Sequence, residues 1–231
     1  MSKESSIERI IGLKDRILDC SRSHGFHKED HSDVFYLGLV MSECGEAINA
    51  DRDRFAPVPD KQQVDRLVDI MTGKWHYEGD NDLKYNKKVL DLYKLFDLYF
   101  TADIKGSVAE ELADIIIRLL DLAALRNMNV CPALPGSICD IRAFSTYIRP
   151  SNELSEILLA LVTFLGGIHV ALDNPEFLKY RYAYFGYAVY SVIECIYDVF
   201  FEKYGMDIGV FVELKVRYNE LRPKFKGERK Y

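Results

Sequence analysis

The chain has 231 residues, of which 48% are hydrophobic and 29% are charged. This length and composition suit one folded domain with a sizeable core and exclude a wholly disordered chain. The formal net charge is −6, which argues against a nucleic-acid binder or a protein of anionic membrane surfaces, because both surfaces repel a net anion. The five cysteines show no CxxC spacing and the opening segment has no apolar signal region, so a cytoplasmic protein with reduced thiols is expected.

Apolar residues recur at helical spacing almost throughout the chain, which predicts an all-α helical bundle. The expected helices run from Ile7 to the polar loop near Gly25, from Ser32 or Asp33 to about Arg54, over 61–75, 87–100 and 107–127, and again from near residues 138, 152, 175 and 207. Ser107 and Glu110 fit a capping box, in which each side chain satisfies a backbone amide at the helix start. The longest uncharged apolar run, 157–172, is shorter than the ~20 residues that span a bilayer, so no membrane segment is predicted.

A dense group of aromatic residues lies between residues 177 and 204. Base stacking is one interpretation of such a group. A core helix or a subunit interface is the favoured interpretation, because aromatic side chains supply much of the buried area in cores and interfaces.

Two of the expected helices carry acidic pairs that a hydrophobic core does not explain. Glu43 and Glu46 lie three residues apart, as do Glu111 and Asp114, and Asp121 follows seven residues later. The i, i+3 spacing places each pair on one helix face. Acids on such apolar helices are costly unless they are paired or bound to a cation. Carboxylate oxygens from two helices suit a hard cation such as Mg²⁺, so we predict a shared metal site.

Less specific interpretations of these residues stay open. A single ExxE pair is common on solvated helix faces, and Arg118 lies four residues after Asp114, where it could form an ordinary intrahelical ion pair. The three histidines His24, His27 and His31 lie in a polar stretch, and we interpret them as incidental loop residues rather than as metal ligands.

The two acidic pairs, with the second inside the phrase EELADIIIRLLDLA, resemble the motif of the MazG-like nucleotide pyrophosphohydrolases of the all-α NTP pyrophosphatase superfamily. The ending VELKVRYNELRPKFKGERKY is similar to the C-terminus of that family. The resemblance covers roughly residues 30–54, 107–130 and 211–231. The matching positions in the ending are Lys215, Asn219, Arg222, Lys226, Gly227 and Lys230.

The resemblance implies a hydrolase that cleaves (d)NTP to (d)NMP and pyrophosphate with Mg²⁺, for which Mn²⁺ could substitute. It implies a homodimer, and Glu43 or Glu46 would accept the proton of the attacking water. The expected metal ligands are Glu43, Glu46, Glu111 and Asp114. The residues expected to contact phosphate or sugar are Lys215, Asn219, Arg222 and Lys226. A solvated basic tail is the equal alternative for this segment.

The chain departs from the family pattern in two places. The connection between the acidic helices is long, so residues 55–106 are interpreted as an insertion within a single domain, 1–231. Residues 131–210 match nothing recognisable and could be a degenerate second half. The main alternative is therefore a catalytically inactive helical interaction or nucleotide-binding module on the same scaffold. A ferritin-like di-iron protein ranks far lower, because the chain has no Glu-x-x-His pair.

Overall fold

The computed structural model describes residues 2–52, 59–74, 85–132, 154–172 and 181–222, and these form helices with no β-strand. The prediction of an all-helical protein is thus confirmed over the described ranges. In these ranges no helix is both long and apolar enough to cross a membrane. The elements are α1 (Lys3–Gly12), α2 (Lys14–Ser23), α3 (Asp33–Arg52), α4 (Lys61–Met71), α5 (Tyr85–Tyr99), the π-helical turn η1 (Phe100–Ile104), α6 (Val108–Leu125), α8 (Leu154–Leu172), α9 (Arg181–Tyr204) and α10 (Ile208–Leu221).

Several helix boundaries differ from those predicted. The single first helix is two helices, α1 and α2, which meet at Leu13. The helix α3 begins as expected, because the Ser32 hydroxyl accepts a hydrogen bond from the Phe35 amide at 3.3 Å.

The segment interpreted as an insertion contains α4, α5 and η1, and both α4 and α5 pack on α10. The helix expected near residue 138 lies outside the described residues.

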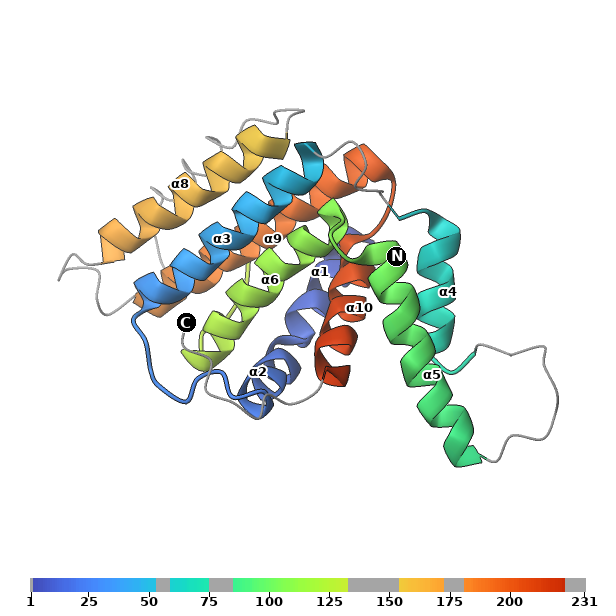
Figure 1. Cartoon of the computed structure of the whole chain (residues 1–231). Coiled ribbons are helices and arrows are strands. Elements are labelled where there is room, and N and C mark those ends of the chain that lie inside the picture. Colours follow the sequence, from blue (N-terminus) through green and yellow to red (C-terminus); the bar gives the residue numbers. More distant parts are fainter. Residues whose placement is uncertain (1, 53–58, 75–84, 133–153, 173–180, 223–231) are drawn as a thin grey trace.

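The helix α6 occupies the centre of the molecule (Figure 1). It contacts α3 on one side and α2 and α10 on the other, and α9 also packs against it. The helix α8 lies on the outer side of α3 (Figure 1). Because α6 has neighbours around most of its circumference, it is apolar on most faces, and any acid on it faces either a neighbouring helix or a narrow strip of solvent.

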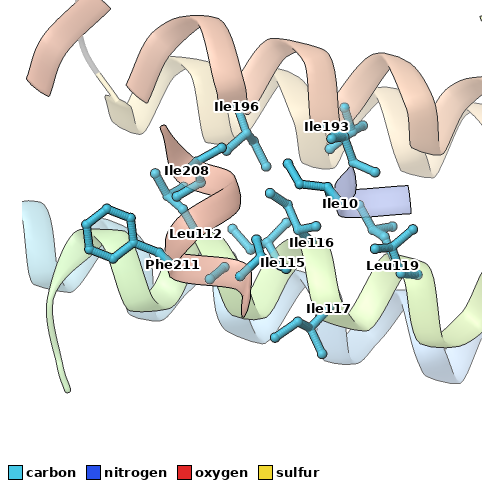
Figure 2. Packing of buried hydrophobic residues seen from close by; sticks show 14 of the residues in the cluster. Ile10, Leu112, Ile115, Ile116, Ile117, Leu119, Ile193, Ile196, Ile208 and Phe211 are labelled. Atoms are coloured by element: carbon cyan, nitrogen blue, oxygen red, sulfur yellow. The ribbon is translucent and has the colours of Figure 1, made fainter. Parts of the chain in front are cut away.

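The core forms around the apolar residues of α6. Figure 2 shows isoleucines of α9 and α1, and residues from the start of α10, packed around the α6 side chains. Each of the central side chains has at most 2% of its surface exposed: Ile10, Leu112, Ile115, Ile116, Leu119, Ile193, Ile196, Ile208 and Phe211. Burial of this apolar surface stabilises the position of α6 relative to its neighbours.

Part of the aromatic stretch contributes to this core. Tyr184, Phe185, Tyr197 and Phe200 of α9 are buried, which agrees with the core interpretation for these residues. At Gly186, α9 lies very close to the backbone of the segment after α6, and an added Cβ would lie 2.0 Å from the Asn129 carbonyl oxygen. Glycine therefore permits α9 to pack against the segment that follows α6.

The start of α10 is bonded to α1. Asp207 is the N-cap of α10 and accepts a hydrogen bond from the Gly209 amide at 2.8 Å. Its other oxygen accepts from the Ser6 hydroxyl at 2.6 Å and from Arg9 at 3.1 Å. One half-buried carboxylate therefore both begins α10 and attaches it to the first helix of the chain.

Candidate metal centre

The seam between α3 and α6 brings three of the predicted metal ligands together. Glu43, Glu46 and Glu111 each offer a carboxylate oxygen, and these oxygens all lie within 4.8 Å of one another. We call these three residues the carboxylate cluster. Glu43 is buried, Glu111 is half-buried and Glu46 is exposed. The cluster therefore has one carboxylate within the protein and one that is accessible to solvent.

The helix start places Glu111 in the first turn of α6. The Ser107 hydroxyl accepts from the Glu110 amide at 3.2 Å, as the predicted capping box requires. The Glu110 carboxylate binds the Gly106 amide rather than that of Ser107, because the Ser107 amide already donates to Ile104 at 3.0 Å. The reciprocal half of the predicted box is therefore displaced by one residue, while negative charge still lies where the helix dipole favours it.

Asp114, the fourth predicted ligand, is not among the mutually close oxygens. Its carboxylate is 2.6 Å from the ammonium of Lys215 on α10. Lys215 also bonds Glu110 and is only 8% exposed. A residue expected to contact phosphate is thus engaged with two α6 acids, and it offsets part of the cost of their burial.

Arg118 joins the two acidic helices. Its Nε donates to Oε1 of Glu43 at 3.0 Å, so this arginine pairs across the seam with α3 instead of one turn back with Asp114. The Arg118 side chain is 33% exposed, whereas that of Glu43 is 12% exposed. The pair engages one oxygen of Glu43 and leaves the second oxygen for a cation.

The acids of this region outnumber the cations bonded to them. Burial, together with the carboxylates of Glu110, Asp114 and Glu46, raises the pKa of Glu111 to about 8, and Lys215 offsets this only in part. Burial also raises the pKa of Asp114 to about 6, although Lys215 acts to lower it. A divalent cation would remove this repulsion, and carboxylate oxygens are the ligands that Mg²⁺ prefers. The residues present therefore fit such an ion.

The remaining predicted contacts lie further along α10. Asn219 and Arg222 follow Lys215 by one and two helical turns, Asn219 is half-buried and Arg222 is exposed. The Arg222 carbonyl oxygen lies 3.0 Å from Nε2 of His24, which fixes the end of α10 against α2. Lys226 lies outside the described residues.

A second polar group lies at the other end of the seam. Asp121 pairs with His27 at 2.9 Å, and the other ring nitrogen of His27 lies 3.2 Å from the Tyr36 hydroxyl. His27 also adopts a left-handed backbone with φ 62°. His27 lies in a turn, as predicted, but its side chain is buried and bonded to Asp121, so the interpretation of it as incidental is wrong. The sequence signal for this pair is Asp121 itself, because an acid within an apolar helical run needs a buried polar partner such as His27.

No family model, curated protein or solved structure matches this chain. Over the described residues, the fold and the site define a class: an all-helical protein with a cluster of carboxylates between two helices. Its place in a particular family stays a prediction from the motifs.

Proposed function

We propose that this protein is a Mg²⁺-dependent nucleoside triphosphate pyrophosphohydrolase on a bundle of the all-α NTP pyrophosphatase type. The observation that carries the proposal is the meeting of Glu43 and Glu46 of α3 with Glu111 of α6 within 4.8 Å. These residues come from the two motifs that resemble the MazG-like family. The homodimer implied by the same resemblance, and the cytoplasmic location expected from the cysteine pattern and the opening segment, form part of the proposal.

Each residue of the site has a proposed task. Glu43, Glu46 and Glu111 would hold the cation, and Lys215 favours the ionised form of Asp114 next to them. When bound, Mg²⁺ neutralises the triphosphate and activates the attacking water. Glu46 is the preferred proton acceptor, because it is exposed whereas Glu43 is already bonded to Arg118. Water then adds to the α phosphorus, the bond to the α–β bridging oxygen breaks, and pyrophosphate leaves.

The test is incubation of the protein with a panel of (d)NTPs and Mg²⁺ or Mn²⁺, with the products identified by chromatography. Monophosphate with pyrophosphate is the expected result. Diphosphate with orthophosphate would contradict the assigned bond.

Substitution of the acids tests the site itself. Glu111→Gln and Asp114→Asn should each abolish turnover, since one removes a ligand and the other removes the charge next to it. Glu8→Gln, on an exposed position of α1, is the matched control and should leave turnover unchanged. Circular dichroism should show the same helical signal in all three variants. Near-native activity of either site variant would show that the assignment is wrong.

A second candidate function has one observation in its favour. Glu43 and Asp114 are both already paired with cations of the chain, Arg118 and Lys215, as expected for acids that serve structure. In a catalytically inactive interaction or nucleotide-binding module, these two ion pairs would serve to hold the helices together. Nucleotide binding without hydrolysis of any (d)NTP by the folded protein would favour this candidate.

A further inference from the structure

We infer that Arg118 contacts the substrate, and that its terminal guanidinium nitrogens bind phosphate oxygens of a ligand held at the carboxylate cluster. This inference rests on the proposed function and adds to it a residue that recognises phosphate. The sequence motifs do not single out Arg118, which was interpreted there only as a possible ion-pair partner of Asp114.

The geometry of the Glu43 pair is the first argument. Arg118 binds Oε1 of Glu43 through Nε at 3.0 Å. A guanidinium is a rigid fork with further N–H donors on its two terminal nitrogens. No described residue accepts a hydrogen bond from those terminal nitrogens. The pair with Glu43 therefore fixes the plane of the guanidinium and leaves most of its donors for another acceptor.

Arg118 differs in exposure and in bonding from Lys215, the other cation of the region. Lys215 is 8% exposed and bonds two acids, Glu110 and Asp114. Arg118 bonds one acid and has 33% of its side chain exposed. A cation that served only to neutralise buried acids would resemble Lys215. The partial exposure of Arg118 leaves it accessible to an anion that arrives from solvent.

Arg118 is also long enough to contact a phosphate group bound next to Glu43. The terminal nitrogens of Arg118 lie within roughly 5 Å of Oε1 of Glu43, because the guanidinium is planar and compact. A phosphate oxygen that shares a Mg²⁺ with a carboxylate lies about 4 Å or less from that carboxylate oxygen, since each Mg–O bond is about 2.1 Å. A phosphate group on the Arg118 side of such a cation can therefore reach the terminal nitrogens, because both are held next to the same Glu43 carboxylate. Arginine also matches phosphate with two parallel hydrogen bonds, which lysine cannot do.

Calorimetric titration of inorganic tripolyphosphate in the presence of Mg²⁺ tests this inference without turnover. Arg118→Gln should weaken tripolyphosphate binding at least about tenfold, through loss of charge-assisted hydrogen bonds. Arg118→Lys retains the charge but not the fork, and should weaken binding by a smaller factor. Arg22→Gln, an exposed position at the end of α2, removes the same charge elsewhere and should leave binding unchanged.

A second titration, with Mn²⁺ alone, separates a phosphate contact from a merely structural role. Arg118→Gln should bind Mn²⁺ as tightly as the wild type or more tightly, because a cation next to Glu43 is removed. A loss of Mn²⁺ affinity equal to the loss for tripolyphosphate would mean that Arg118 only positions Glu43, and would overturn the inference. If the Gln variant does not fold, the Lys variant supplies both measurements.

The two titrations and the (d)NTP assay together separate a role of Arg118 in phosphate binding from the hydrolase activity itself. Wild-type tripolyphosphate affinity in Arg118→Gln, with nucleotide hydrolysis by the wild type, would overturn the inference alone. A wild-type protein that neither binds tripolyphosphate with Mg²⁺ nor hydrolyses any (d)NTP would overturn both.

Discussion

Glu111 is the residue whose ionisation depends most on what occupies the site. Its pKa is raised to about 8 by burial and by the carboxylates of Glu110, Asp114 and Glu46. At pH 7 the carboxyl group is therefore mostly protonated in the absence of a cation. A metal ion binds the carboxylate form and must displace this proton.

Metal binding at pH 7 should consequently release close to one proton per ion. Calorimetric titrations of Mn²⁺ in buffers with different ionisation enthalpies measure this number. The apparent affinity should rise by up to about tenfold per pH unit below pH 8 and then level off. Glu111→Gln should bind the ion weakly and without the proton release. A wild-type affinity that is independent of pH between 6 and 8 would contradict this role of Glu111.

At the scale of single elements, the close approach at Gly186 makes α9 sensitive to one added methyl group. Gly186→Ala places a Cβ 2.0 Å from the Asn129 carbonyl oxygen and 2.9 Å from its carbon, so α9 or the segment after α6 must move. We expect a loss of about 1–3 kcal/mol in the free energy of unfolding, measured by urea denaturation.

Gly166→Ala in α8 is the matched control for that substitution. Gly166 is also helical but has nothing within 4 Å of the added Cβ. The control should be neutral or stabilise the protein by up to about 1 kcal/mol, because alanine is the better helix former. Equal effects of the two substitutions would show that the contact at Gly186 does not limit the packing of α9.

The helices that carry the site are also those that the sequence predicts best. The range predicted from Ser107 to residue 127 is observed as Val108–Leu125, since a capping serine and a continuous apolar period define its limits. The break at Leu13 was not predictable in this way, because the apolar period continues through it. Local sequence carries the signal for a helix, whereas a change of direction between two helices depends on packing against α9 and α10.

In the site, too, the features set by local sequence were predictable and those set by packing between helices were not. The i, i+3 spacing predicts that each acidic pair shares a helix face, and three of the four acids meet as expected. The ion-pair partners of Glu43 and Asp114 were not predictable, because Arg118 reaches α3 across the seam and Lys215 reaches α6 from α10. Those contacts depend on how the helices are rotated against one another, which a single sequence does not specify.

At the scale of the whole molecule, the acidic cluster should make stability depend on pH and on metal ions together. The folded-state pKa of Glu111, about 8, lies above its ordinary value of 4.5, and that of Asp114, about 6, lies above 3.8. The folded state therefore binds protons more tightly than the unfolded state between these limits. The contribution of both groups to stability is present at low pH and is lost as the pH rises through the folded-state values.

Without metal, the free energy of unfolding should fall between pH 5.5 and pH 8, by an amount of the order of a few kcal/mol at most. Urea denaturation in EDTA at both values measures the fall, and Glu111→Gln should reduce it. Addition of Mg²⁺ at pH 8 should restore stability in the wild type, because the ion binds only the folded site, and should have little effect in the variant. Insensitivity of the wild type to both EDTA and Mg²⁺ at pH 8 would count against a metal site.

The attachment of α1 to α10 extends the influence of the first dozen residues well beyond their own surroundings. Asp207 receives bonds from Ser6 and Arg9 and also starts the helix that carries Lys215. Deletion of α1 would therefore remove the bonds that hold the start of α10 and would disturb the position of Lys215 next to Asp114. A purification tag ahead of the first helix is better removed by cleavage before Ser2, so that this helix keeps its own N-cap.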